Sequence, residues 1–155
     1  MITKQEVIKA QEAWGKALVK IGSLKDNREL CEKEAEKLLR ELYAFEKKEI
    51  LFKPTKACAI PFRSSIEAAK SYMLGGNSNF PEDTGFALKP WIKVRFDNKN
   101  IILEERRAFA MGHYFFTDAQ ANETKVEFTF GYWKNDRGEL KIDIQHSSLP
   151  FQPPV

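Results

Sequence analysis

The first half of the chain has hydrophobic positions at helical spacing. Behind Thr3-x-x-Glu6, which matches a capping box at the start of a helix, apolar residues recur every three or four positions up to Gly22. We expect Gly22 to end this first helix in a left-handed cap. Asp26 or Asn27 then caps a second helix, whose apolar stripe consists of Leu30, Cys31, Ala35, Leu38, Leu39 and Leu42. The spacing therefore predicts two amphipathic helices in succession.

Shorter elements and a long loop follow these two helices. Residues 50–52 are an apolar run that a proline soon stops, which predicts a short strand. A second capping box, Ser64-x-x-Glu67, predicts a third helix that runs to the glycines at positions 75–76. Residues 77–90 are rich in Gly, Pro, Asn and Asp, and we expect a loop long enough to carry function.

The second half alternates hydrophobic and polar residues, a pattern that is typical of half-buried strands. Residues 92–97 and 126–132 each form one such strand. Residues 101–117 form either one long strand region or two strands joined by a bulge near Gly112. A hairpin turn at residues 135–138 leads into the last strand. Helices followed by antiparallel strands indicate an α+β fold, in which the helices cover one face of a curved sheet.

Length and charge narrow the class of protein. A chain of 155 residues is expected to be one domain, spanning residues 1–155, whose N-terminal helices pack on a curved antiparallel sheet and enclose a pocket. The 25 basic and 22 acidic residues are interspersed, so we expect no nucleic-acid partner. No run of about 18 apolar residues and no signal-peptide pattern is present, so we expect no membrane span and no export. Two cysteines fit a reducing, cytoplasmic compartment.

Metal ligands are scarce in this sequence. Catalytic zinc takes three protein ligands, usually histidines, but the chain has only His113 and His146, both in predicted strands. The acidic pairs at residues 82–83 and 104–105 are adjacent in extended chain, where neighbouring side chains point to opposite faces. We therefore expect these pairs on the solvated surface, and we expect neither a metal nor another cofactor.

Hydroxyl groups are the remaining candidates for chemistry. They are Thr55 behind a proline, Tyr72 on the third helix, and Ser147 and Ser148 at the end of the last strand. Each also has a purely structural interpretation, as a turn hydroxyl, a half-buried aromatic or a strand-end cap. A cysteine–histidine nucleophile would use Cys58, but nothing in its flanking residues supports one.

Several motifs in the same order resemble those of one known family. They are Phe52-Lys53-Pro54-Thr55 and residues 71–76, 80–91, 110–116, 126–132 and 146–151. Together they resemble the iota-class carbonic anhydrases of bacteria and algae, over about two-thirds of the chain. That family resembles the association domain of calcium/calmodulin-dependent protein kinase II and the wider NTF2-like superfamily. The resemblance therefore implies an NTF2-like cone.

The same resemblance implies a function and a site. The function is reversible hydration of CO2 to bicarbonate and a proton, in a pocket described for some members as metal-free and lined by Thr, Tyr and Ser. Carried over residue by residue, these are Thr55, Tyr72 and Ser147, as catalytic and substrate-binding residues. Ser148 is the rival for the last place. Strand alternation places Ser148 on the face of Ile142, and Ser147 on the opposite face unless a bulge intervenes.

Two other functions are compatible with such a cone. A non-enzymatic oligomerisation or small-acid-binding module of the kinase association-domain type would use the same fold. An isomerase or cyclase of the NTF2-like kind would need an Asp, Glu or His base inside the cone, for which His113, His146 and the loop acids are the only candidates. We expect CO2 and bicarbonate as the small-molecule partners, and a homodimer.

Overall fold

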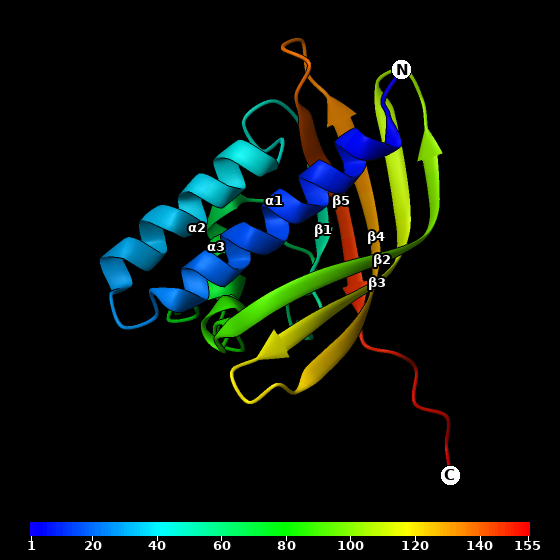
Figure 1. The fold of residues 1–155 in the computed structure, drawn as a ribbon. Helices are drawn as coiled ribbons and strands as arrows, with labels where there is room; N and C mark the ends of the chain where they lie inside the picture. Colours follow the sequence, from blue (N-terminus) through cyan, green and yellow to red (C-terminus); the bar gives the residue numbers. More distant parts are fainter.

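Three helices lie on one face of a five-stranded sheet in the computed structural model, which describes residues 1–155 (Figure 1). The helices are α1 (Lys4–Ser23), α2 (Arg28–Leu42) and α3 (Ile66–Leu74), and η1 (Phe86–Leu88) is a short 3-10 helix. The strands are β1 (Leu51–Lys53), β2 (Trp91–Leu103), β3 (Arg107–Asp118), β4 (Glu123–Lys134) and β5 (Leu140–Ser148). The sheet order is β1-β5-β4-β3-β2, with β1 parallel to β5 and all other neighbours antiparallel. The predicted α+β fold is confirmed.

The first helix begins as predicted but ends differently. The Thr3 hydroxyl accepts a hydrogen bond from the Glu6 amide at 3.2 Å, and the Glu6 carboxylate accepts one from the Thr3 amide at 2.7 Å. This is the predicted capping box. The predicted left-handed cap at Gly22 is wrong, because α1 continues through Gly22 to Ser23. A Cβ at Gly22 would lie 2.7 Å from the Ala87 carbonyl oxygen, so the glycine serves the close contact with η1.

The next two helices each depart from the prediction at one residue. Leu30, expected in the apolar stripe of α2, is 40% exposed. The third helix is capped by Ser65, whose hydroxyl accepts from the Ala68 amide at 3.1 Å, and not by Ser64. The backbone amide of Arg63 donates to Phe52 in β1, which keeps the chain outside the helix up to this point.

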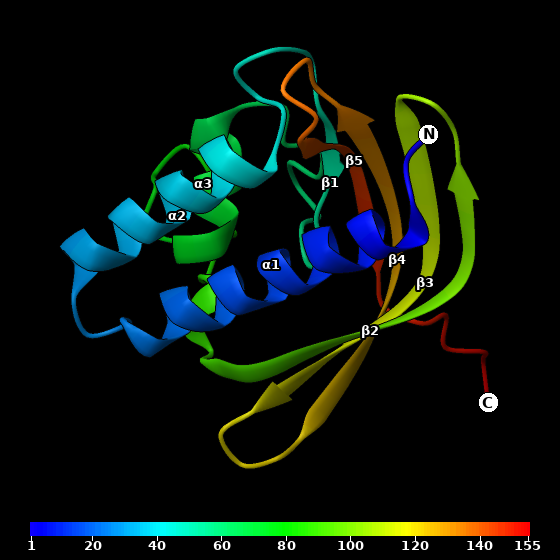
Figure 2. The ribbon, with the colours of Figure 1, turned by 45° about the horizontal axis from the view of Figure 1, so that its top comes forward.

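The strand region at residues 101–117 is divided by a turn after Leu103, not by a bulge in β3 near Gly112. A Cβ at Gly112 would collide with the Asp97 carbonyl oxygen of β2, and the register of β2 shifts close by, between Asn98 and Asn100. The irregularity thus lies in β2, opposite the glycine. Figure 2 shows the strong bend of β2, which curves the sheet around α1.

Aromatic side chains fill the space between α1 and the inner face of the sheet. The Trp14 ring packs edge-on against Phe96, Phe116 and Phe130, at centroid separations of 6.0–6.1 Å. It also lies 5.5 Å from the ring of Tyr114. Edge-to-face and tilted contacts of this kind are favourable for aromatic quadrupoles. The concave face of the sheet is therefore a packed core with little free space.

Neither cysteine forms a disulfide. Cys31 is buried on α2, as its place in the apolar stripe predicts, and Cys58 lies exposed in the loop after β1. None of the helices is both long enough and apolar enough to cross a membrane.

Candidate active site

A small cavity lies in the core between α1, α3 and the ends of β1 and β5. Its volume is about 20 Å³. A cavity needs about 10–15 Å³ to hold a water molecule, so it accommodates one very small molecule. Its walls are mainly apolar and are formed by Trp14, Leu18, Phe52, Pro54, Thr55, Tyr72, Met73, Phe86, Tyr114, Gln145 and Ser147. Thr55, Tyr72 and Ser147, which come from three distant parts of the sequence, thus line one cavity.

A β-bulge turns Ser147 into this cavity. Ile142 and Ile144 pair with consecutive residues of β4, so Asp143 is an extra residue in β5. The bulge reverses the alternation of side chains beyond it. Ile142 is buried before the bulge, and Gln145 and Ser147 are buried after it. The sequence analysis placed Ser147 on the face opposite Ile142 unless a bulge intervened, and this bulge is present.

The extra residue is held by two cations. Asp143 is almost fully buried, and its carboxylate accepts from the Arg107 guanidinium at 2.8 Å and from the Lys48 ammonium at 2.7 Å. A buried carboxylate needs such partners, because desolvating an unpaired charge is costly. The ion pairs therefore favour the bulged geometry over a regular strand.

Ser148 and both histidines lie across the sheet from the cavity. Ser148, His113 and His146 line a depression of about 400 Å³ on the face that carries no helices. The Nε2 atom of His113 is 3.7 Å from the Glu127 carboxylate, which also lines this depression. The structure therefore does not bring Ser148 together with Thr55, Tyr72 and Ser147. It also leaves the cavity without an Asp, Glu or His base, which the isomerase hypothesis needs.

Tyr72 projects from α3 and meets the loop that follows β1. Its hydroxyl accepts a hydrogen bond from the Lys56 amide at 3.0 Å. Burial raises the pKa of Tyr72 well above its ordinary range, and the hydrogen bonds from Lys56 and Thr55 only partly oppose this effect. The phenol therefore stays protonated at neutral pH and acts by hydrogen bonding.

The carboxylate of Glu82 organises the loop that carries Thr55. It accepts hydrogen bonds from the backbone amides of Cys58, Ala59 and Ile60, at 2.6, 3.1 and 2.7 Å. These amides hold the pKa of the Glu82 carboxyl below its ordinary value. Glu82 thus connects the loop of residues 77–90 to the loop that follows β1 and carries Thr55.

A buried ion pair joins the same two loops. The Arg63 guanidinium donates to both carboxylate oxygens of Asp83, at 2.7 and 2.8 Å, and neither side chain is exposed to solvent. Arg63 also donates to the carbonyls of Ile60 and Ala68, while the Ser71 hydroxyl donates to Asp83. The prediction that residues 82–83 form a solvated surface pair is therefore wrong for Asp83, because a buried arginine faces it.

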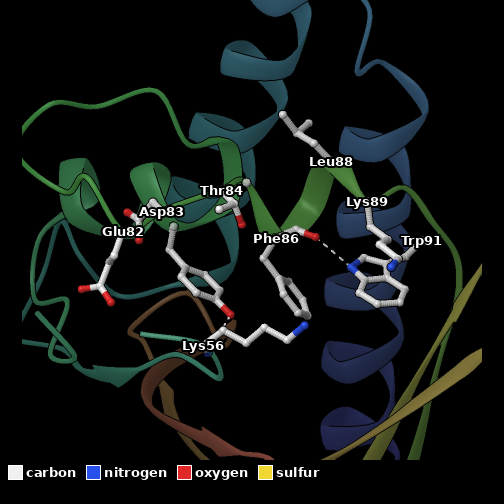
Figure 3. A pocket seen from close by; sticks show the side chains of 10 residues that line it. Lys56, Glu82, Asp83, Thr84, Phe86, Leu88, Lys89 and Trp91 are labelled. Carbon is white, nitrogen blue, oxygen red and sulfur yellow. Dashed lines mark hydrogen bonds between the residues drawn. The ribbon is translucent and has the colours of Figure 1, made fainter. Parts of the chain in front are cut away.

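A wider pocket of about 260 Å³ lies outside the cavity (Figure 3). Lys56, Phe86, Lys89 and Trp91 are among the residues around it. Tyr72 and Phe86 line both spaces, and their stacked rings lie 5.5 Å apart between centroids. These two rings thus form a wall between the cavity and a pocket that opens to solvent.

Two polar residues of the cavity were missed by the sequence analysis. The Tyr114 and Ser147 hydroxyls are hydrogen-bonded, and the Gln145 amide donates to Tyr114 at 3.3 Å. Burial raises the pKa of Tyr114 to about 12, so it also stays protonated. Strand alternation offered a signal for Tyr114, which shares the buried parity of Phe116, but none for Gln145, because the bulge at Asp143 reverses the alternation in β5.

The residues define what the cavity can do. Hydroxyl groups converge on a space that apolar side chains otherwise line, so a small polar molecule is held and oriented by hydrogen bonds. No three His, Cys, Asp or Glu residues lie close enough together to hold a metal ion. Fold and site together define an α+β cone with a small, hydroxyl-lined cavity.

Comparison with known proteins identifies the family. A family model described as metal-independent carbonic anhydrase matches residues 5–149. The chain is 40% identical over 154 residues to the metal-independent carbonic anhydrase of Nostoc sp. (strain PCC 7120 / SAG 25.82 / UTEX 2576), an alignment that covers 97% of this chain and 75% of that protein. The chain therefore belongs to the metal-independent carbonic anhydrase family.

Solved structures agree with this assignment. The crystal structure of a cyanobacterial iota-carbonic anhydrase complexed with bicarbonate matches with a TM-score of 0.95 and 39% identity, covering 98% of this chain and 94% of that chain. A putative calcium/calmodulin-dependent protein kinase II association domain from Xanthomonas campestris matches with a TM-score of 0.65 and 21% identity, covering 97% and 89%. The second likeness shows the fold alone. Both the family resemblance and the NTF2-like fold expected from the sequence are confirmed.

Proposed function

We propose that this chain is an iota-class carbonic anhydrase that hydrates CO2 reversibly to bicarbonate and a proton, using the hydroxyls of Thr55, Tyr72 and Ser147. The observation that carries the proposal is the convergence of these three hydroxyls on one small cavity, in a chain of this family. A similar enzyme of known structure is complexed with bicarbonate, which supports bicarbonate as the ligand here.

The energetics limit how these hydroxyls act. Zinc lowers the pKa of bound water from about 15.7 to about 7, and at about 1.36 kcal/mol per unit this is worth about 12 kcal/mol. Neutral hydroxyls do not produce a shift of that size. The cavity therefore holds neutral water and not a standing hydroxide, and the water loses its proton as its oxygen bonds to the CO2 carbon.

The cavity lowers the barrier by position and by hydrogen bonding. The cavity has room for one small molecule, so the wall formed by Tyr72 and Phe86 must open toward the outer pocket to admit both water and CO2. Thr55, Tyr72 and Ser147 then orient the water beside CO2, Thr55 and Tyr72 pass on its proton, and Ser147 stabilises the forming bicarbonate. The apolar walls, which include Leu18 and Phe52, hold CO2 itself. The proton and bicarbonate leave through the outer pocket. We expect a turnover rate below that of zinc carbonic anhydrases.

Single substitutions test the assignment. We expect Thr55→Ala, Tyr72→Phe and Ser147→Ala each to lower kcat/KM for CO2 hydration by about 10²–10³-fold, the usual cost of removing one such donor. Ser148→Ala is the matched control, because Ser148 lies one residue away on the opposite face, and it should keep the parent rate. Unchanged activity in all three cavity variants would show that the chemistry occurs elsewhere.

We also propose that the protein is a homodimer formed through the outer face of the sheet. Ile102 and Met111 are 59% and 56% exposed there, on adjacent strands that carry no helices on this side. The same face carries both Arg95 and Glu127, so a second copy offers opposite charges as well as apolar contact. Sedimentation of the parent and of Met111→Glu tests this: a dimer that the substitution splits is expected, and a monomeric parent contradicts it.

For location, we propose the cytoplasm. The support is that neither cysteine forms a disulfide and that Cys58 is an exposed free thiol, as suits a reducing compartment. Cell fractionation followed by detection of the protein tests this. Recovery in an extracytoplasmic fraction would contradict it.

A further inference from the structure

A chain of buried hydrogen bonds runs from α1 through the core to the cavity. The Trp14 indole donates to the Tyr43 hydroxyl at 2.9 Å, and the Tyr43 hydroxyl donates to the Gln145 side-chain oxygen. The Gln145 side-chain nitrogen donates to the Tyr114 hydroxyl at 3.3 Å, and Tyr114 is hydrogen-bonded to Ser147. All five side chains are buried, so bulk water does not compete for these hydrogen bonds.

The donor and acceptor groups of these side chains give the series of hydrogen bonds one direction. The Trp14 indole can only donate, so Tyr43 accepts from it and has one proton left for Gln145. That proton needs the oxygen of the Gln145 amide, so the amide nitrogen faces Tyr114. Tyr114 accepts from this nitrogen, which leaves its own single proton for a neighbouring hydroxyl oxygen. Ser147 is its direct hydrogen-bond partner and takes this proton in preference to Thr55, which also lies near Tyr114.

Reversal of the Tyr43–Gln145 link would leave a buried proton without an acceptor, which is costly. Reversal of the Tyr114–Ser147 link would turn the Tyr114 proton from Ser147, its direct hydrogen-bond partner, toward the neighbouring Thr55 hydroxyl. Ionisation does not reverse the chain either, because burial raises the pKa of Tyr43 and Tyr114 above their ordinary range. The Ser147 oxygen is thus an acceptor on the Tyr114 side at all pH values near neutrality. Its own proton is left free for the cavity.

We infer that this hydrogen-bond chain fixes Ser147 as a hydrogen-bond donor toward the substrate, with Gln145 and Tyr43 as positioning residues that set its direction. The inference rests on the proposed function, which assigns Ser147 to the site. As the water oxygen bonds to the CO2 carbon, one C=O pair of electrons moves to its oxygen, and Ser147 donates to that oxygen. The proton from the water leaves by way of Thr55 and Tyr72 and not by way of Ser147.

Substitution Gln145→Glu tests the direction with almost no change of shape. An ionised carboxylate accepts from both Tyr43 and Tyr114, so Tyr114 turns its proton away from Ser147. Ser147 then donates to Tyr114 and no longer to the substrate. When the introduced carboxyl is protonated, its O–H replaces the amide N–H and the original direction returns.

The readout is the CO2 hydration rate of the variant divided by that of the parent, measured from about pH 6 to about pH 9. This range is chosen because burial raises the pKa of the carboxyl introduced in Gln145→Glu. We expect the ratio to approach one at low pH and to fall by about 10²-fold as the carboxyl ionises. Gln145→Leu is the control, because it cannot titrate, and its ratio should not change with pH. Circular dichroism verifies that both variants are folded.

The outcomes separate this inference from the proposed function. Full activity in Ser147→Ala would overturn the site assignment itself. An inactive Ser147→Ala together with a flat pH ratio for Gln145→Glu would overturn only the direction of the chain. If Gln145→Glu does not fold, Tyr114→Phe decides. It leaves Ser147 its own proton and should cost about two- to tenfold, the worth of one neutral hydrogen bond, whereas a loss equal to that of Ser147→Ala overturns the inference.

Discussion

Replacing Asp83 by alanine removes one partner of the buried ion pair that joins the two loops beside the cavity. Neither Asp83 nor Arg63 is exposed to solvent, and two hydrogen bonds of 2.7 and 2.8 Å connect them. In Asp83→Ala the guanidinium of Arg63 stays buried, and the nearest remaining carboxylate is that of Glu82, at 3.7 Å. The variant therefore leaves a largely uncompensated buried charge.

The structure sets the expected size of this effect. Removing one partner of a buried pair costs about 3–5 kcal/mol. For a chain of this length, 1 kcal/mol shifts Tm by about 2–4 °C, so Tm should fall by about 6–20 °C. CO2 hydration should also fall at temperatures where the variant is folded, because the loop that begins with Thr55 loses an anchor.

Chemical denaturation of four proteins measures the free energy of unfolding. Asp136→Ala is the control, since Asp136 is 95% exposed and pairs with Arg106 at 3.0 Å, and a surface pair is worth about 0–1 kcal/mol. The double variant Arg63→Met, Asp83→Leu removes both charges and should recover most of the lost stability. A cost below about 1 kcal/mol for Asp83→Ala, or a double variant no more stable than Asp83→Ala, would refute the reasoning.

Three further predictions use the titratable groups. Burial raises the pKa of all four tyrosines, so the folded protein should show little tyrosinate absorbance at about pH 10. Its stability should decline as pH rises above that value, because the unfolded tyrosines ionise first. Tyrosine titration of the native protein at about pH 10 would contradict this. Glu6→Gln should cost about 1 kcal/mol at neutral pH, because the Thr3 amide and Lys134 hold the pKa of Glu6 at about 2. This contribution is present above the unfolded pKa and is lost as pH falls toward about 2, so denaturation curves that do not converge in acid would argue against it. A thiol reagent should modify Cys58 at once and Cys31 only on unfolding, because burial covers Cys31 and raises its pKa.

Local patterns predicted much of the fold. The capping box at Thr3 and the alternation of β4 depend on neighbours in the sequence, so they can be read directly from it. The direction of β5 side chains could not be read in this way. The bulge at Asp143 depends on Arg107 and Lys48, which are far away in the sequence, and only the folded sheet brings the three together.

The same distinction applies to the site. Thr55, Tyr72, Ser147 and Ser148 were the hydroxyl candidates left by elimination. Only the family resemblance assigned the first three to one site, because a lone hydroxyl has too many structural uses. Tyr114 and Gln145 looked like ordinary strand residues until their partners were known. A hydrogen-bond network is a property of tertiary structure, and its members carry no common sequence pattern.

In the proposed mechanism hydroxyl groups, and no metal ion, activate water for CO2 hydration. The most direct test is the CO2 hydration rate of protein that has been treated with chelators and assayed for residual metal. We predict that the rate per protein molecule is unchanged when the metal content is far below one atom per chain, and that added zinc does not raise it. A rate that disappears with the metal and returns with zinc would show that a metal ion activates the water.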